Sequence, residues 1–404
     1  MDRPVVSVII PTYNGSALLR RTLHHLSLQR LPTDRFEVIV ADDGSSDDTR
    51  AVVDEAAARL RIRYHFQPDE GFRAGAARNA GALLADAPLL VFLDTGAMVG
   101  PDFLTAHLSE HVPGGRSAVM GYAHGYNLQT RVAGLAEALA RADPEDVVRE
   151  FGAVPEFADV RHEQFADCDF DAGRLAAPWV LFWTLNCSLP AEDFWRAGGF
   201  DEGFRGWGLE DQELGHRLFH GGMAFRVSRR AWVVESPHER DLGTIFAECR
   251  ANLVRLMAKH PEPAVEILWH LMEAQENPLG LEAHYSFLRG WTEQARELAV
   301  TAEIEQALAE VPPDARVAIF GCGAKVPPRA ATTVLIDFDA TVRPQHHAIG
   351  LRTPLADHAV DAVLLTSRLS GLWARWGRDL TAEARRVGGT VHRTADLAGQ
   401  TSSS

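Results

Sequence analysis

The sequence is poor in cysteine and has no long run of apolar residues. Its cysteines, Cys168, Cys187, Cys249 and Cys322, show neither Cys-x-x-Cys spacing nor the density of a disulfide-stapled domain. No apolar run approaches the roughly 18 residues that a membrane helix needs. The first residues, MDRPVVSVIIPTYN, place an acid early and lack the apolar core of a signal peptide. We therefore expect a soluble cytoplasmic protein without a membrane span.

Positive charge is also scarce. The chain has 40 Lys and Arg against 55 Asp and Glu, a net charge of −15 at pH 7. This balance argues against nucleic acid or an anionic membrane surface as the main partner. Apolar content of 46% and charged content of 24% are those of an ordinary globular protein. A length of 404 residues predicts two or three domains, each able to bury a core.

The first hundred residues alternate between strand and helix patterns. The runs 5–10, 36–42 and 89–94 are almost wholly apolar, as in strands buried on both faces, and a shorter strand is expected at IRYHF. Helices are expected near 17–28 and 49–60. This alternation predicts an α/β fold with a mostly parallel, doubly wound sheet. Such sheets bind ligands at the carboxyl ends of their strands, where Tyr13, Asp43 and Asp94 fall.

The remaining chain is predicted in three stretches. The apolar run WVLFWTLNCSLP (179–190) indicates another buried strand. Residues 242–310 have a helical pattern that Pro261, Pro263 and Pro278 break into short helices. A strand and turn follow at 312–325.

The segment Phe200–Leu218, FDEGFRGWGLEDQELGHRL, concentrates carboxylates and glycines around one tryptophan. Trp207 lies between two glycines, where a large ring has little local core to join, so it suggests stacking on a sugar or another flat ligand. Glu210 and Asp211 open a helix whose macrodipole favours their ionised form. A turn followed by ordinary helix-start charge is the simpler explanation of the carboxylate pair alone.

Strand-end acids and a glycine-rich loop together indicate a nucleotide site. Asp43 is suited to accept hydrogen bonds from a base or ribose, and Tyr13 to stack on the base. Arg73 and Arg78, in GFRAGAARN, supply positive charge for a diphosphate. Taken singly, each residue fits a turn, a helix cap or an ion pair equally well; their position at successive strand ends favours the nucleotide.

The motifs VSVIIPTYNG, VIVADDGSSDDT, GFRAGAARNAGA, LLVFLD and NCSLPAEDFWRAGGFDEGFRGWGLEDQELGHRL resemble those of the family 2 glycosyltransferases. The last motif is close to the carboxyl-terminal motif of galactosyltransferase-like and chondroitin-synthase-like members. The resemblance covers roughly residues 4–240. It implies a GT-A fold, a nucleotide-sugar donor that is usually UDP-linked, and transfer with inversion at the anomeric carbon.

The resemblance also assigns roles to single residues. It implies that Asp211 is the catalytic base, that Glu210 holds hydroxyls of the acceptor or donor, and that Trp207 with Gly208 forms the acceptor floor. The positions implied for donor binding are Pro11, Tyr13, Asp43, Arg73, Arg78, Asp94 and Asn186.

The metal site departs from the family pattern. The acidic Asp-x-Asp element appears as Asp94-Thr95-Gly96, so Gly96 stands where the second acid is expected. Apart from the resemblance, His238 is most simply a surface histidine beside Glu239. It matches a late metal-binding histidine, and the resemblance implies Mn²⁺ or Mg²⁺ held by Asp94 and His238. Three outcomes stay open: a weakened metal site, metal-free transfer assisted by arginine, or donor binding without turnover.

The last ninety residues resemble class I methyltransferases in RVAIFGCGA, VLIDFDA, PLADHAVDAVLL and EARRVGGTVHR. Gly321, Gly323 and Asp337 match the cofactor-binding positions. Lys325 replaces the third glycine, and Pro327 with Pro328 falls where the first helix is expected, so S-adenosylmethionine binding is disfavoured. The expected domains are 1–241 (GT-A), 242–310 (helical, covering the acceptor side or a dimer contact), 311–396 (small inactive Rossmann-like domain) and 397–404 (disordered tail).

Together these patterns predict a soluble, non-processive inverting glycosyltransferase that moves a hexose from a nucleotide-diphosphate sugar to a hydroxyl or other nucleophile. A glycan, a peptide and a small molecule all remain open as the acceptor, and a homodimer remains open as the assembly. One alternative is a nucleotide-sugar-binding pseudoenzyme that acts as a scaffold or regulator. Another is a bifunctional glycosyl- and methyltransferase.

Overall fold

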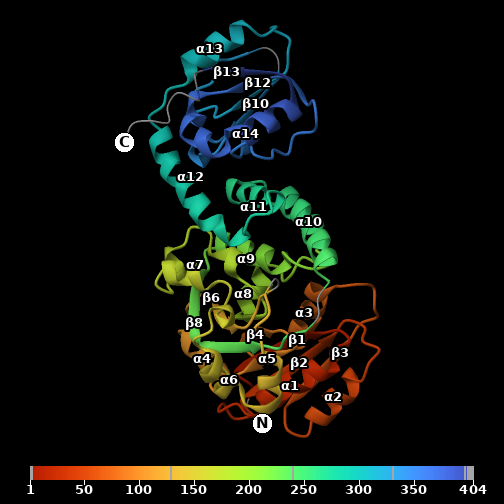
Figure 1. Cartoon of the computed structure of the whole chain (residues 1–404). Coiled ribbons are helices and arrows are strands. Elements are labelled where there is room, and N and C mark those ends of the chain that lie inside the picture. The colour runs from red at the N-terminus through yellow and green to blue at the C-terminus, as the bar shows by residue number, and fades with distance from the viewer. Residues whose placement is uncertain (1–2, 128–129, 239–240, 330–331, 395–396, 398–404) are drawn as a thin grey trace. The chain divides into compact units, whose positions relative to one another are not determined.

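The computed structural model describes residues 3–127, 130–238, 241–329, 332–394 and 397 (Figure 1). The chain divides into two compact units, Met1–Asn252 and Leu253–Ser404. None of the helices in the described part has both the length and the apolar character needed to span a membrane.

The first unit is built on an eight-stranded mixed sheet with the order β3-β2-β1-β4-β7-β6-β8-β5. Its strands are β1 Val6–Thr12, β2 Phe36–Asp42, β3 Ile62–Phe66, β4 Leu89–Leu93, β5 Ala97–Val99, β6 Ser117–His124, β7 Asn186–Pro190 and β8 Ala224–Glu235. The strands β3, β2, β1 and β4 are parallel, β7 is antiparallel to both β4 and β6, and β8 is parallel to β6. The carboxyl ends of β1, β2, β4, β6 and β8 therefore meet at one edge of the sheet.

Helices cover both faces of this sheet. They are α1 Ser16–Ser27, α2 Thr49–Ala56, α3 Ala74–Leu83, α4 Phe103–Glu110, α5 Leu135–Arg141, α6 Pro144–Phe151, α7 His162–Asp167, α8 Ala191–Arg196 and α9 Glu210–His220, with the 3-10 turns η1 Pro155–Phe157, η2 Ala172–Arg174 and η3 Pro178–Leu181. Helix α10, Leu242–Lys259, runs across the boundary between the two units.

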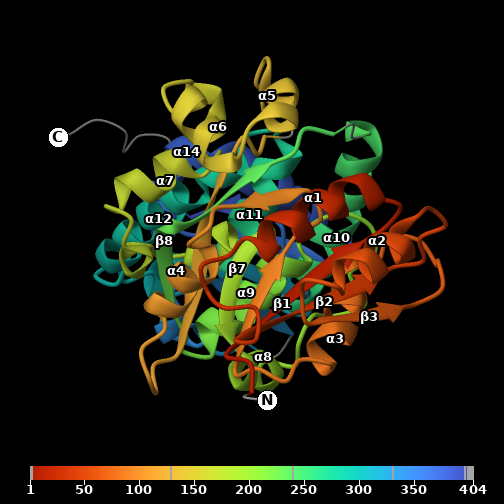
Figure 2. The same cartoon turned by 90° about the horizontal axis from the view of Figure 1, so that it is seen from below.

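The apolar run of β1 is buried because it packs on both sides. Val8 and Ile10 belong to the core that also contains Leu23 of α1 and Val52 of α2. On the opposite face, α3 approaches closely at Gly81, where a Cβ would lie 2.8 Å from Ile9. Figure 2 shows β1, β2 and β3 between α1 and α2 on one side and α3 on the other. This is the doubly wound packing that the sequence predicts.

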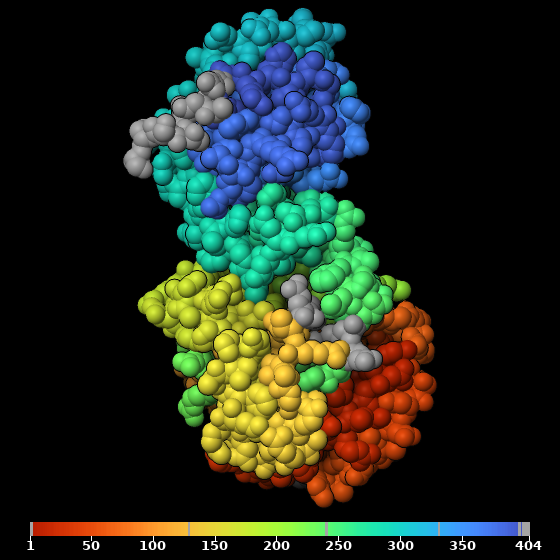
Figure 3. Space-filling view, viewed as in Figure 1, coloured from red at the N-terminus to blue at the C-terminus, as the bar shows by residue number. Residues whose placement is uncertain are grey.

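The segment 125–178 connects β6 to β7 and carries α5, α6 and α7. Its described part has a core of its own, which includes Leu135, Val147 and Phe157 and joins the sheet through Val234 of β8. Figure 3 shows this segment, in yellow, beside the N-terminal residues in red.

The second unit contains a five-stranded, wholly parallel sheet with the order β11-β10-β9-β12-β13. Its strands are β9 Val317–Phe320, β10 Thr333–Asp337, β11 His346–His347, β12 Val360–Leu365 and β13 Gly388–Arg393. Its helices are α11 Pro263–Glu273, α12 Leu281–Ala295, α13 Thr301–Ala309 and α14 Ser370–Val387, with the 3-10 turns η4 Pro278–Gly280, η5 Ala340–Val342 and η6 Ser367–Leu369.

One element of the sequence prediction is wrong. The apolar run 179–190 does not form a single strand: η3 ends at Leu181 and β7 begins only at Asn186. Residues 179–182 are all buried because this turn packs against α9. A buried helical turn and a buried strand both give an apolar run, so the pattern alone does not distinguish them. The predicted disordered tail, 397–404, lies outside the described residues except for Leu397.

Candidate active site

The carboxyl edge of the first sheet gathers most of the residues that the sequence singles out. Tyr13 follows β1, Asp43 follows β2 and Asp94 follows β4. Asp94 is tied to the start of β7, because its N–H donates to the carbonyl of Leu185 (3.1 Å). Pro11 lies within β1 at the same edge, and its carbonyl accepts the hydroxyl of Thr95 (2.8 Å).

Asp43 is buried under the loop that follows β3. Its carboxylate accepts the side-chain amide of Gln67 (2.6 Å) and the backbone N–H of Arg73 (2.7 Å). Tyr13 is 51% exposed, and its hydroxyl donates to Asp69 of the same loop (2.8 Å). This hydrogen bond raises the pKa of Tyr13. An exposed ring beside a buried carboxylate is a suitable arrangement for stacking and hydrogen bonding to a nucleoside.

The two arginines proposed for the diphosphate have carboxylate partners. Arg73 lies 3.3 Å from Asp43 and 2.9 Å from Glu70. Arg78, buried in α3, donates to Asp94 (2.8 Å) and to Glu210 (3.0 Å). Its guanidinium therefore bridges the strand-end acid and the helix-start acid.

Glu210 and Asp211 open α9 at the centre of this edge. Asp211 is partly exposed, and its carboxylate accepts the N–H of Gln212 (2.7 Å) and of Thr184 (3.3 Å). Glu210 is buried; Arg78 contacts its Oε1, while its Oε2 has no hydrogen-bond partner among the described residues. This oxygen is itself buried, so it is an acceptor that the described part of the protein leaves unsatisfied.

The environment of Asp211 favours its protonated form. Burial of the carboxylate, followed by the neighbouring charge of Glu210, raises the pKa of Asp211 to about 7, against the opposing charge of Arg78. A carboxylate that binds its proton near neutral pH is matched to the work of a general base. Perturbed groups of this kind gather at functional sites.

Helix α10 holds the Gly-Trp-Gly turn in front of these acids. Glu248 accepts the N–H of Trp207 (2.8 Å), and Asn252 donates to the carbonyl of Gly208 (2.8 Å). Both glycines have positive φ, 76° at Gly206 and 91° at Gly208, and a Cβ at Gly206 would lie 2.8 Å from Glu248. The turn therefore requires glycine at these two positions. Trp207, which precedes Asp211 by four residues, is partly exposed.

The segments of the implied metal site run side by side. β5 pairs with the end of β8, and the N–H of Ser236 donates to the carbonyl of Gly96 (3.1 Å). Two residues further on, His238 Nδ1 lies 3.1 Å from the carbonyl of Ser236. Gly96 has φ 100°, and a Cβ there would contact Leu18 of α1. The positive φ therefore favours glycine at this turn, and the side chain of an acid placed here would point toward Leu18 of α1.

Asn186, which the resemblance places beside the donor sugar, is the first residue of β7. Its side chain is buried; Oδ1 accepts a hydrogen bond from His107 Nε2 (2.9 Å), and Nδ2 donates to the carbonyls of Tyr122 (3.3 Å) and Ala231 (2.8 Å). These bonds join β7 to the neighbouring strands β6 and β8.

Sequence reasoning missed Asp159 and Arg161, a buried ion pair that contacts the segment leading into β7. Arg161 is 1% exposed; it pairs with Asp159 (2.8 Å), donates to the carbonyl of Leu181 (2.8 Å), and lies over the ring of Trp183 (4.7 Å). A lone Asp-x-Arg in a polar stretch gives no signal of this role, because its partners are distant in sequence.

Comparison with known proteins identifies two family models. Residues 7–163 match glycosyl transferase family 2, and residues 166–239 match the N-terminal domain of galactosyltransferase. Validoxylamine A glucosyltransferase of Streptomyces hygroscopicus subsp. jinggangensis (strain 5008) is 42% identical over 96% of each chain. Chondroitin synthase of Escherichia coli is 30% identical over 55% of this chain and 33% of its own length.

Among solved structures, a mannosyltransferase of Pyrobaculum calidifontis in complex with GDP-Man and Mn²⁺ aligns over 64% of each chain, with TM-score 0.44 and 20% identity. The family matches and the sheet described above confirm the predicted resemblance to family 2 glycosyltransferases and the α/β GT-A fold class.

Proposed function

The chain belongs to glycosyl transferase family 2, and we propose that it is a non-processive inverting enzyme that moves glucose from UDP-glucose to a hydroxyl of a small polyhydroxylated acceptor. The named relative, similar over 96% of each chain, supports glucose as the sugar and validoxylamine A as the first acceptor to test. The observation that carries the proposal is the partly exposed residue Asp211 at the head of α9, with a carboxylate whose pKa is raised to about 7.

In the proposed reaction Asp211 is the general base. As the acceptor oxygen attacks the anomeric carbon, its proton passes to Asp211. The bond from that carbon to the diphosphate oxygen breaks, the electron pair leaves with the nucleotide diphosphate, and the configuration inverts. Glu210 holds a hydroxyl through its unpartnered Oε2, and Trp207 with Gly208 provides the acceptor floor.

The nucleotide is proposed to bind where Tyr13 and Asp43 close the carboxyl ends of β1 and β2. Tyr13 offers an exposed ring for the base, and the loop that covers Asp43 brings Arg73 with it. Arg78 is a positioning residue in this proposal, because its guanidinium is paired with Asp94 and Glu210 and orients both carboxylates.

The donor set fits a divalent cation of the kind that GT-A enzymes commonly use. Asp94 has a side chain 35% exposed and supplies a carboxylate, and His238 supplies an imidazole on the adjacent segment. Carboxylate and imidazole ligands suit Mn²⁺, and Mg²⁺ is commonly held by one carboxylate with substrate phosphates. When bound, the cation neutralises charge on the leaving diphosphate. Asp94 and His238 would hold it; Gly96 supplies no side-chain ligand.

The test is a donor and acceptor screen by mass spectrometry with Mn²⁺ present. UDP-glucose and validoxylamine A are expected to give a product heavier by one hexosyl residue. Asp211→Asn should lower kcat by about 10²–10⁴-fold while nucleotide affinity stays unchanged, because the base is lost and the nucleotide contacts are not. Asp34→Asn, in an exposed loop, is the matched control.

Two results would overturn the proposal. Full turnover by Asp211→Asn would exclude Asp211 as the base. Binding of UDP-sugars without hydrolysis or transfer of any donor would favour the pseudoenzyme alternative, for which the missing acid at Gly96 is the supporting observation.

A further inference from the structure

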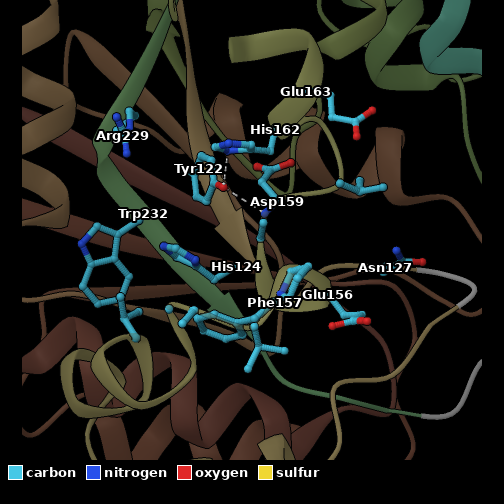
Figure 4. Close-up of a pocket in the computed structure, with 17 residues that line it drawn as sticks. Tyr122, His124, Asn127, Glu156, Phe157, Asp159, His162, Glu163, Arg229 and Trp232 are labelled. Atoms are coloured by element: carbon cyan, nitrogen blue, oxygen red, sulfur yellow. Dashed lines mark hydrogen bonds between the residues drawn. The ribbon is translucent and has the colours of Figure 1, made fainter.

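A cavity of about 800 Å³ lies beside β6 and β8 in the first unit, away from the nucleotide side of the sheet. Figure 4 shows its lining, which comes from the two strands and from the segment 125–178. The residues that matter here are Tyr122, His124, Glu156, His162, Glu163 and Trp232.

The order of the strands sets the position of this cavity relative to the carboxylates. Along the sheet, β2 and β1 are followed by β4, β7, β6 and β8. Tyr13 and Asp43 follow β1 and β2, Asp94 follows β4, and Asp211 contacts Thr184 just ahead of β7. The cavity is on β6 and β8, so the catalytic carboxylates lie between it and the nucleotide side. An acceptor that extends away from the donor would extend in this direction.

A chain of contacts links the lining of the cavity to Asp211. Asp159 lines the cavity and pairs with Arg161, which lies over the ring of Trp183 (4.7 Å). Trp183 precedes Thr184, whose N–H donates to Asp211. The ring of Tyr126, which precedes the lining residue Asn127 in the chain, lies 5.6 Å from that of Trp183.

The lining suits a ring with many hydroxyls. His162 Nδ1 lies 2.8 Å from the Tyr122 hydroxyl, and the His124 ring is stacked on Phe157 with its centroid 6.1 Å from that of Trp232. Aromatic faces of this kind cover the C–H faces of a sugar or cyclitol, while carboxylates and imidazoles bond its hydroxyls. A volume of about 800 Å³ is within the usual range of small-molecule sites.

The charges of the lining disfavour a phosphate. Glu156 and Glu163 are exposed carboxylates of the lining, whereas Arg229, the arginine of the lining, already lies over the Phe170 ring (4.6 Å). Burial lowers the pKa of His124 to about 4, so this imidazole is neutral at pH 7. A neutral or amine-bearing ligand is therefore favoured over an anionic one.

We propose that this cavity is an acceptor subsite, which binds the polyhydroxylated ring, with or without an amine, that is remote from the reacting hydroxyl. The proposal rests on the proposed glycosyl transfer, because the subsite is defined relative to Asp211. It assigns to the segment 125–178 the selection of the acceptor, while the nucleotide is bound on the other side of the carboxylates.

The first test is steady-state kinetics of the full chain with UDP-glucose and validoxylamine A. The double variant Glu156→Gln and Glu163→Gln should raise the KM for validoxylamine A about tenfold or more, because two carboxylate acceptors become weaker amides. The kcat at saturating acceptor, the KM for UDP-glucose and the rate of UDP-glucose hydrolysis should not change. Glu145→Gln, on the exposed face of α6 and outside the lining, is the matched control.

The second test is calorimetric titration of validoxylamine A into the same proteins without donor. Weaker binding to the double variant than to the control supports the subsite even if no protein turns over a donor, in which case only the proposed function fails. An unchanged KM and unchanged binding in the double variant, with transfer intact, would overturn the subsite and leave the function standing. No binding of validoxylamine A to the unaltered protein would also overturn it.

Discussion

Asp211 owes its properties to its neighbours more than to its position on a helix. The start of α9 stabilises an ionised acid, and the N–H groups of Gln212 and Thr184 add to this. Burial and the charge of Glu210 act in the opposite direction and are stronger, so the pKa is raised to about 7. Arg78 limits the rise, because its charge favours the ionised carboxylate. The carboxyl of Asp211 can therefore both bind and release a proton near neutral pH, as the proposed role of general base requires.

The rate of transfer should follow the ionisation of Asp211. Below a pH of about 7, kcat/KM should rise about tenfold for each pH unit, and above it the profile should level off, because only the ionised form accepts the acceptor proton. Release of UDP between pH 5 and pH 9 measures this profile. Glu210→Gln removes a charge that raises the pKa, so its inflection should fall to lower pH. An inflection unmoved by that variant would contradict the assigned cause.

The stability of the folded protein should also depend on pH because of the raised pKa of Asp211. A carboxyl whose folded pKa exceeds its ordinary value near 4 contributes stability at low pH, and this contribution is lost as the pH rises through about 7. Asp211→Asn removes the buried charge, so it should raise the melting temperature more at pH 8 than at pH 5. Thermal unfolding at both values checks this, with Asp34→Asn as control; an equal effect at both would exclude a raised pKa in the folded state.

At the scale of elements, the Gly-Trp-Gly turn depends on a helix that is remote in sequence. Glu248→Ala removes the acceptor of the Trp207 N–H, a charge-assisted bond worth about 1.5–3 kcal/mol. We expect a kcat reduced about tenfold or more and a change in tryptophan fluorescence, because the acceptor floor is no longer fixed. Val254→Ala, exposed on the same helix, is the control. Unchanged kcat in Glu248→Ala would show that the turn holds its shape without α10.

The sequence predicts the elements well where a pattern is local. The apolar runs of β1, β2 and β4 and the acids at their ends follow from neighbouring residues alone, and so does the helix that Glu210 opens. The contacts that complete the site join distant residues: Glu248 with Trp207, Arg78 with Glu210, and Arg161 with Leu181. No local spacing encodes such pairs. The prediction of one strand over 179–190 was wrong because an apolar run indicates burial but does not distinguish a strand from a helical turn.

At the scale of the whole molecule, the second unit differs from a cofactor-binding sheet in its own side chains. Its strand order reverses between β9 and β12, the point where doubly wound sheets bind ligands. Arg368, just after β12, is 2% exposed there. It donates to Asp337 (3.0 and 3.1 Å) and lies over the ring of Phe338. Asp337 also accepts the N–H of Gly323 (2.9 Å), so the acid that would meet a ribose is engaged by the protein.

Arg368 therefore occupies the side of Asp337 that a cofactor ribose would contact. The described part of the connection between β9 and β10 contains no helix, so the helix N-terminus that would face a bound nucleotide is missing as well. The unit can then be stable without a ligand, because the charge of its buried acid is balanced from within. The bifunctional alternative would require Arg368 to leave this position.

Calorimetric titration of the full chain with S-adenosylmethionine should therefore give no heat of binding. Arg368→Ala should destabilise the second unit by about 3–5 kcal/mol, because Asp337, 0% exposed, would keep a buried charge without its partner. Arg378→Ala, exposed on α14, is the control and should change little. Micromolar binding of S-adenosylmethionine by the unaltered chain would show that the crevice opens, and a stability unchanged in Arg368→Ala would show that the pair does not hold this unit together. Either result would support the methyltransferase alternative, because Asp337 would then be able to bind a ribose in place of Arg368.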